Sequence, residues 1–356
     1  MEAIPLPPGT ELRVEQRLFR FRKPARTSRG ALSERPVWFI HADTPWGTAT
    51  GECSPMPALS PESKLDNLEN TLWELCAQVK ARGALMPHMA TEWPACRLAL
   101  EGAILQASCP GTPLWDTPFS RGEKGVEIHH LIWMADAATM LHAMQQGVRH
   151  GFRCLKMKVG ALPFPQEVAL LQEAHRRFPG IELRVDANGA FAPEDVLSKL
   201  QQLADAGVSC IEQPLPPGST AAMHLLCRQT PLPIALDEEL IPHHSLADKE
   251  RLLETIAPQA IVLKPTLHGG LQGTQEWARL ATEHGIRWWI NSALETPIGL
   301  SLLAQWCGRY APDTLHGLST GKLLEERFST PIHLEGAQLF MRIPEKQPTK
   351  AATPFA

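Results

Sequence analysis

The spacing of apolar residues over the first 125 positions predicts strands followed by helices. From Glu11 to about Cys53, polar and apolar residues alternate, as in Leu12-Arg13-Val14-Glu15, which is typical of antiparallel strands. From Ser60 to Gln106, apolar residues recur every three to four positions, and a second helix is predicted over Pro94–Ser108. The stretch from Cys109 to Gly125 is rich in Gly and Pro, as linkers are. We therefore expect a small α+β domain over residues 1–124.

After Gly125 the pattern changes to short apolar runs that alternate with amphipathic helical windows, which indicates repeated βα units and a parallel sheet. Polar residues end the predicted strands at positions 158, 186, 212, 237, 264 and 291, at intervals of 28, 26, 25, 27 and 27. An open, doubly wound sheet would gather such residues at one switch point, so a closed barrel is favoured. The predicted strands are Ile128–Met134, Leu155–Val159, Leu183–Asp186, Cys210–Glu212, Ile234–Asp237, Ile261–Lys264, Trp288–Ser292 and Leu315–Leu318.

Beyond Ser329 the repeat ends, and two further strands are predicted at Ile332–Leu334 and Leu339–Ile343. We expect them to return to the first domain. The predicted fold is thus α/β: a (β/α)7–8 TIM-like barrel over residues 125–329, with an N-terminal α+β domain completed by residues 330–356.

Three consecutive predicted strands end in carboxylates, at Asp186, Glu212 and Asp237. The C-terminal strand ends of a barrel converge on one site. Like charges brought together there raise one another's pKa unless a cation neutralises them. A hard dication with oxygen ligands does this, and Mg²⁺ suits three carboxylates, with Mn²⁺ as the alternative. Any one of these acids alone is as well explained as the cap of the next helix.

Two lysines, Lys156 and Lys158, lie two positions apart on one predicted strand and therefore point to the same side. Lysines under packed helices are costly, so the barrel interior is favoured. There the charge of Lys156 would lower the pKa of Lys158 and suit it to act as a base. Lys264 ends its strand in the same way. Lysines facing a bound metal predict proton abstraction next to a carboxylate.

The net charge, the apolar runs and the cysteine spacing argue against several classes of protein. The net charge is −4, without the basic footprint of a nucleic-acid-binding protein. No apolar run approaches the roughly 18 residues of a membrane span, and no export signal is recognisable, so we expect a cytoplasmic enzyme. The eight cysteines are scattered without metal-binding spacing and are expected to be buried as free thiols. Monomer and homo-oligomer remain open.

Weaker signals concern three places. His129 and His130 are adjacent on a strand and face opposite ways, so a core histidine is favoured over a metal ligand. Gly269-Gly270-Leu271-Gln272-Gly273 matches a phosphate loop poorly and favours a helix start. The stretch from Arg13 to Arg35 is interpreted as a solvated strand face, with Arg26 and Arg29 over an anionic substrate as the sharper hypothesis.

Together, these residues resemble the enolase superfamily, in its muconate-lactonizing-enzyme-like subgroup. Within that subgroup, several stretches are similar to the o-succinylbenzoate synthase family of menaquinone biosynthesis. They are Gly51-Glu52-Cys53-Ser54-Pro55-Met56-Pro57, Leu131-Ile132-Trp133-Met134, Lys264-Pro265-Thr266-Leu267, Asn291-Ser292-Ala293-Leu294-Glu295 and Pro312-Asp313-Thr314. The resemblance covers essentially the whole chain and implies that the first domain caps the barrel.

The resemblance implies a hydro-lyase that dehydrates 2-succinyl-6-hydroxy-2,4-cyclohexadiene-1-carboxylate to 2-succinylbenzoate. Lys158 would remove the proton alpha to the ring carboxylate, Mg²⁺ on the three carboxylates would stabilise the enediolate, and Lys264 would add charge from the opposite face. Asn291 stands where a serine is common in relatives. Residues expected to bind or support this small anionic substrate are Lys156, Asn188, Glu238, Asn291, Ser292, Glu295, Arg26, Arg29, Ser54 and Pro55.

Two other functions remain open. A racemase or epimerase of N-acylated amino acids, such as N-succinylamino acids, would use Lys158 and Lys264 as two bases on opposite faces. Dipeptide epimerases often carry Asp-x-Asp near the last strand, where this chain has His316-Gly317-Leu318-Ser319-Thr320, which disfavours dipeptides. A catalytically silent binding protein would have no need of the paired lysines.

Overall fold

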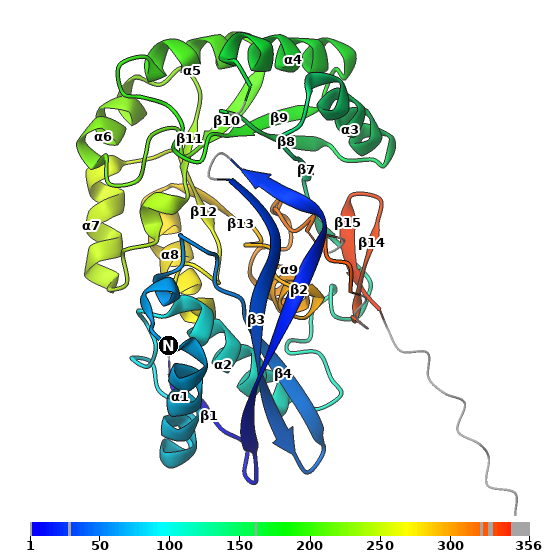
Figure 1. Cartoon of the computed structure of the whole chain (residues 1–356), viewed down its shortest axis with the longest axis vertical. Helices are drawn as coiled ribbons and strands as arrows, with labels where there is room; N and C mark the ends of the chain where they lie inside the picture. The colour runs from blue at the N-terminus through cyan, green and yellow to red at the C-terminus, as the bar shows by residue number, and fades with distance from the viewer. Residues whose placement is uncertain (1, 28–29, 161, 321–322, 327–329, 343–356) are drawn as a thin grey trace, which may run out of the picture.

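The computed structural model describes residues 2–27, 30–160, 162–320, 323–326 and 330–342. An N-terminal domain lies against the open end of a curled parallel sheet whose outer side is covered by helices (Figure 1). This arrangement confirms the predicted combination of a barrel and an α+β capping domain. No helix of the described part is long and apolar enough to cross a membrane.

The capping domain is built on a long antiparallel hairpin. Its three-stranded sheet has the order β2-β3-β4 and packs against helix α2. Gly51 is required at this contact, because an added Cβ would lie 1.8 Å from the carbonyl oxygen of Ala99. The helix predicted over Pro94–Ser108 is confirmed. The elements are β1 (Ile4–Pro5), β2 (Glu11–Thr27), β3 (Gly30–Thr44), β4 (Gly47–Cys53), the 3₁₀ helix η1 (Pro61–Lys64), α1 (Leu68–Arg82), β5 (Ala84–Leu85) and α2 (Pro94–Ser108).

The barrel sheet is parallel, with the order β13-β12-β11-β10-β9-β8-β7. Its strands are β7 (His130–Ile132), β8 (Cys154–Lys158), β9 (Glu182–Asp186), β10 (Val208–Glu212), β11 (Ile234–Leu236), β12 (Ala260–Leu263) and β13 (Arg287–Ile290). The helices are α3 (Ala137–Arg149), α4 (Phe164–Arg177), α5 (Val196–Asp205), α6 (Thr220–Gln229), α7 (Leu246–Ile256), α8 (Gly270–Glu283) and α9 (Pro297–Tyr310), with the 3₁₀ helix η2 (Glu238–Leu240) after β11.

Two residues close the ring where an eighth strand was predicted over Leu315–Leu318. His316 forms a parallel bridge with Ile128, and Gly317 forms one with Asn291. The amide of Gly317 donates to the carbonyl of Ile290 at 2.7 Å, and the amide of His129 donates to that of His316 at 2.9 Å. The predicted eighth strand is thus reduced to two bridges, which close the ring between β13 and the residues before β7.

The C-terminal strands pair with the start of the barrel region. β14 (Ile332–Glu335) and β15 (Gln338–Met341) form a sheet with β6 (Val126–Glu127). Ile332, Leu339 and Met341 pack in the same apolar cluster as Val126. Leu324 forms a bridge with Phe21 of β2, in the capping sheet. The expected return of the two strands to the first domain stays a prediction.

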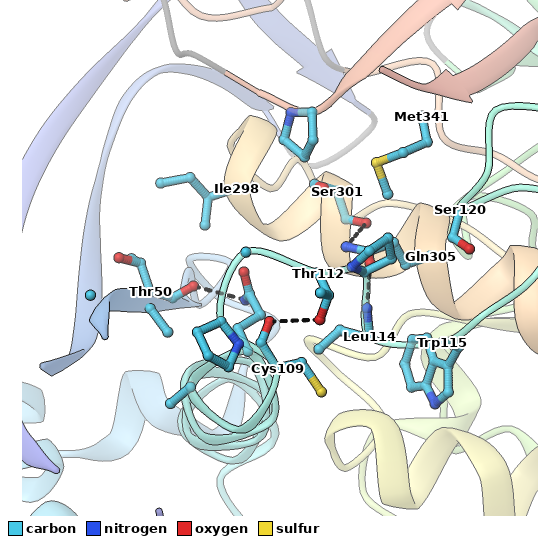
Figure 2. A pocket seen from close by; sticks show the side chains of 18 of the residues that line it. Thr50, Cys109, Thr112, Leu114, Trp115, Ser120, Ile298, Ser301, Gln305 and Met341 are labelled. Atoms are coloured by element: carbon cyan, nitrogen blue, oxygen red, sulfur yellow. Dashed lines mark hydrogen bonds between the residues drawn. The ribbon is translucent and has the colours of Figure 1, made fainter. Parts of the chain in front are cut away.

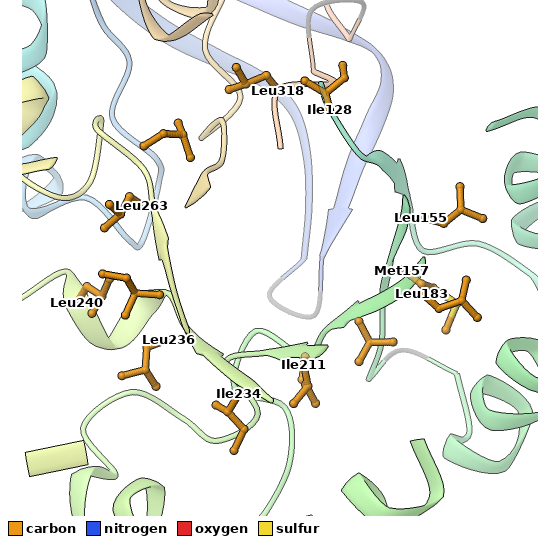
Figure 3. Packing of buried hydrophobic residues seen from close by; sticks show 14 of the residues in the cluster. Ile128, Leu155, Met157, Leu183, Ile211, Ile234, Leu236, Leu240, Leu263 and Leu318 are labelled. Carbon is orange, nitrogen blue, oxygen red and sulfur yellow. The ribbon is translucent and has the colours of Figure 1, made fainter. Parts of the chain in front are cut away.

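The main core lies between the barrel strands and the outer helices. In Figure 3, Leu155, Met157, Ile211, Leu236 and Leu263 point outward from the ring of strands. Side chains alternate along a strand, so Lys156 and Lys158 point to the interior, as predicted. The eight cysteines are free thiols, and all except the half-buried Cys109 are buried.

Two buried glutamates of the capping domain bind the N-termini of barrel helices. Glu52 of β4 accepts hydrogen bonds from the amides of Thr296 and Gly299, at the start of α9, each at 2.8 Å. Glu101 of α2 accepts from the amides of Leu271 and Gln272, at the start of α8. A carboxylate satisfies the unpaired amides and the positive end of the helix dipole at such a position.

Candidate active site

A pocket of about 280 Å³ lies at the C-terminal ends of the barrel strands. One wall comes from the tip of the β2–β3 hairpin, through Ala25, Gly30, Ala31 and Leu32, and a second from the loop 56–59. The barrel contributes Lys156, Lys158, Asp186, Asn188, Glu238, Lys264, Asn291 and Ser292. Both predicted catalytic lysines and Asp186 thus line one cavity, whereas Glu212 and Asp237 are buried and do not line it.

The three predicted carboxylates are held by lysine ammonium groups. The Nζ of Lys156 lies 3.0 Å from Asp186 Oδ2 and 2.6 Å from Glu212 Oε2. Lys158 Nζ donates to Asp186 Oδ2 at 3.1 Å and to Asn188 Oδ1 at 2.7 Å. Lys264 Nζ pairs with Asp237. The carboxylates are at most 3% exposed, which means that these ion pairs lie in a low-dielectric interior.

The two lysines predicted to act on the substrate lie on opposite walls. Lys158 ends β8 and Lys264 follows β12, four positions further round the ring. With the closing segment at His316–Gly317 as the eighth position, a separation of four places them across the barrel. A planar substrate between them would present one face to each ammonium group.

The charges in the pocket shift the pKa values in different directions. Burial and the neighbouring Asp186 carboxylate raise the pKa of Glu212 well above its usual range. Burial also opposes ionisation of Asp186, but the charges of Lys156 and Lys158 outweigh it and hold the pKa of Asp186 well below its usual range. Burial would lower the pKa of Lys264, but the charges of Asp237 and Glu212 outweigh burial and hold the pKa of Lys264 above its usual range.

The carboxylate set fits a hard dication. Glu212 Oε1 and Asp237 Oδ1 are buried, and neither has a hydrogen-bond partner among the described residues. An unpaired buried carboxylate oxygen is costly, and coordination to a cation removes that cost. The raised pKa of Glu212 also favours a bound cation, because a positive charge beside Asp186 and Glu212 would offset the repulsion between the two carboxylates.

A tighter group of possible metal ligands lies outside the pocket. The ligand atoms of Glu250 and Glu254 on α7 and of His284 after α8 lie within 4.8 Å of one another. Among the described residues, these ligand atoms lie closer together than those of Asp186, Glu212 and Asp237, which pair with lysines. Those three carboxylates are the better candidates, because they are buried and two of their oxygens lack partners among the described residues, whereas all three residues of the outer group are exposed.

Some of the predicted supporting residues line the pocket, and others lie behind the residues that line it. Asn188 Nδ2 donates to Glu238 Oε1 at 2.9 Å, and Asn291 Nδ2 donates to Glu212 Oε2 at 3.3 Å. Glu295 does not line the pocket but accepts from Ser292 Oγ at 2.5 Å and from the hydroxyl of Thr266. Glu295 therefore supports the pocket from behind.

Four of the residues expected to contact the substrate are not seen to line the pocket among the described residues. Ser54 and Pro55 do not line the pocket, because their carbonyl groups face the buried guanidinium of Arg35, and the wall begins at Met56. Arg29 lies outside the described residues, as does the side chain of Arg26, although Arg26 pairs with Ala31 near the hairpin tip. Their role toward the substrate stays a prediction.

Sequence patterns missed the apolar side of the pocket and part of its support. Leu131, Trp133, Met56, Leu59, Leu267 and Leu294 line it. The buried Gln213 side chain accepts from the amides of Asp237 at 3.1 Å and Glu239 at 3.2 Å and so orients the strand end. His129 also lines the pocket, and its buried Nδ1 has no hydrogen-bond partner among the described residues, unlike the satisfied core histidine that was favoured.

A second cavity, of about 1090 Å³, lies between β4, the linker 109–116 and helix α9 (Figure 2). Its described lining includes Thr50, Trp115, Ser301 and Gln305, and none of the residues predicted to bind metal or to act in catalysis. The smaller pocket is therefore the better candidate for the active site.

Known proteins resemble this chain over nearly its full length. A family model described as Enolase C-terminal domain-like matches residues 139–346. The o-succinylbenzoate synthase of Desulfotalea psychrophila is 37% identical over 366 residues, which cover 93% of this chain and 99% of that protein. The crystal structure of MenC from the same organism superposes with a TM-score of 0.79 and 31% identity, over 94% of this chain and 100% of that one.

More distant relatives share the fold. The L-Ala-D/L-Glu epimerase of Bacillus subtilis is 24% identical over 62% of this chain and 60% of that protein. The structure of its substrate-liganded complex has a TM-score of 0.77 at 19% identity, over 96% of each chain.

Proposed function

This chain belongs to the o-succinylbenzoate synthase family of the enolase superfamily, and from that premise we propose that the 280 Å³ pocket is its active site. The enzyme is a hydro-lyase of menaquinone biosynthesis that converts 2-succinyl-6-hydroxy-2,4-cyclohexadiene-1-carboxylate into 2-succinylbenzoate and water. The observation that carries the site assignment is the placement of Lys158 and Lys264 on opposite walls, with three buried carboxylates between them.

Lys158 acts as the base. Its Nζ takes the proton alpha to the ring carboxylate, and the resulting ammonium group, which Asp186 and Asn188 orient, returns a proton to the departing hydroxyl on the same face. The C–H and C–O bonds break, a ring double bond forms, and water leaves. Because the ring becomes aromatic, the elimination is favourable and needs little further acid catalysis.

Lys264 acts by charge. The carboxylate of Asp237 pairs with its ammonium group, and the charges of Asp237 and Glu212 hold the pKa of Lys264 above its usual range. A fixed cation on the far face stabilises negative charge as it develops on the substrate.

Asp186, Glu212 and Asp237 would hold Mg²⁺, or Mn²⁺ in its place. When bound, the ion supplies positive charge beside the substrate carboxylate. We propose that the substrate is a small anionic carboxylate, that no nucleic acid or membrane takes part, and that the enzyme works in the cytoplasm.

Racemisation of N-succinylamino acids is the second candidate, because two lysines on opposite walls also suit removal and return of a proton on different faces. The two candidates are separated by following the ultraviolet absorbance of the cyclohexadiene with and without EDTA, beside deuterium exchange of N-succinylamino acids in D₂O. We expect metal-dependent aromatisation. Racemisation without any dehydration would overturn the proposed function.

A further inference from the structure

Arg35 of β3 is a buried arginine in a stretch where sequence patterns favour a solvated strand face. Its side chain is 1% exposed and lies beside the apolar cluster of Phe19, Val37, Phe39 and Leu294. Burial lowers the pKa of Arg35, and the charges of Glu52 and Glu295 oppose that shift. A guanidinium group remains charged even so, and a buried charge persists in a fold only where many polar groups meet it.

The two terminal nitrogens of Arg35 bind two different loops. Nη1 donates to the carbonyl oxygens of Ala293 at 3.1 Å and Leu294 at 3.0 Å, and it also lies 3.5 Å from Met56 Sδ. Nη2 donates to the carbonyls of Ser54 and Pro55. The first loop continues from Asn291 and Ser292, and the second leads into Met56 to Leu59, so both loops form walls of the pocket.

Each of these walls contains a residue in the left-handed region. Ala58 has φ 61° and Leu294 has φ 66°, and both line the pocket. A residue other than glycine in this region costs about 1–2 kcal/mol and persists only where the surroundings impose it. The carbonyl of Leu294 is one of those that Arg35 binds, so the guanidinium opposes relaxation of this wall directly.

We propose that Arg35 is a positioning residue that sets the spacing of two loops, 54–59 and 291–294, whose residues 56–59 and 291–294 line the pocket, and thereby sets the affinity of the pocket for its substrate. It touches neither the substrate nor the reacting atoms. The planar guanidinium group donates hydrogen bonds to both loops at once, whereas the single nitrogen of a lysine would bind only one of them. The proposal rests on the proposed function only for the choice of ligand.

The test compares Arg35→Lys with Arg97→Lys. Arg97 is the control for a buried arginine, because it is also 1% exposed and donates to the carbonyls of Met86, Pro87 and Met89, which are not pocket residues. Its other partners are Glu101 and Gln272, which do not line the pocket either. The measurements are kcat and KM for the cyclohexadiene, the affinity for 2-succinylbenzoate by calorimetry, and Tm. Arg35→Gln, which removes the buried charge and keeps two donors, replaces Arg35→Lys if the latter is insoluble.

We expect both arginine variants to lose thermal stability. Only the Arg35 variant should raise KM and weaken product binding, by about tenfold, with kcat within about threefold of wild type, because uniform binding is lost and the base is untouched. An unchanged KM, or an equal rise in Arg97→Lys, would overturn the proposal. If the wild-type enzyme neither binds 2-succinylbenzoate nor forms it, the proposed function fails instead.

Discussion

Replacing Lys158 with alanine tests the proposed mechanism most directly. The ammonium group lies 3.1 Å from Asp186 Oδ2 and 2.7 Å from Asn188 Oδ1, and the side chain is 9% exposed. Removing one partner of a buried ion pair costs about 3–5 kcal/mol when the other charge is left alone. Asp186 retains Lys156 at 3.0 Å and the amide of Asn188 at 3.0 Å, so we expect the smaller loss of about 1–2 kcal/mol that accompanies a hydrogen bond.

The expected loss of turnover is much larger. Removal of a general base lowers the rate by about 10⁴-fold, which corresponds to about 5.5 kcal/mol of activation free energy. The assay follows the ultraviolet absorbance of the cyclohexadiene, with Tm and Mg²⁺ binding by calorimetry as controls for folding and for the metal site. A Lys158→Ala enzyme that keeps more than about a tenth of wild-type kcat would refute the role of Lys158 as the base. Lys80→Ala, on the exposed end of α1, is the matched surface control.

Three further outcomes are expected. EDTA should abolish dehydration, and added Mg²⁺ should restore it, as followed by absorbance; activity that survives exhaustive chelation argues against the metal. Gly317→Ala should lower stability in urea by about 1–3 kcal/mol, since its Cβ would lie 1.9 Å from Asn291 Oδ1 and 2.8 Å from His129 Cε1, and a wild-type midpoint would contradict this. Burial raises the pKa of Glu62 to about 7 from 4.5, so its contribution to stability is fully present below pH 4.5 and is lost as the pH rises to about 7. Glu62→Gln should therefore gain up to about 3 kcal/mol relative to wild type between pH 5 and pH 8 in thermal melts, and a pH-independent difference would exclude this titration.

The barrel and its polar strand ends were predictable from the sequence for a physical reason. Strand ends in a parallel barrel converge whatever the loops do, so the positions of Lys158, Asp186 and Lys264 in the chain are enough to bring them together. The alternation along β8 likewise assigned Lys156 and Lys158 to the interior without knowledge of the tertiary contacts.

Contacts between segments far apart in the chain could not be predicted from local sequence patterns. Local periodicity predicts strands at Ile332–Leu334 and Leu339–Ile343, but it carries no information on whether β6 or the capping sheet is their partner. Arg35 has the alternating pattern of a surface strand, and its burial depends on carbonyl groups of Ser54 and Leu294, 19 and 259 positions away. The apolar pocket wall, with Trp133 and Leu294, was missed because such residues look like ordinary core.

The glutamates that reach from the capping domain to α8 and α9 also limit how this protein can be divided. An excised barrel would begin two of its helices without the anions that complete them, and these helices come after the loops that contain Lys264 and Asn291. Recombination between relatives would therefore have to exchange both halves together. Glu52 and Glu101 make the cap a part of the catalytic scaffold rather than a removable cover.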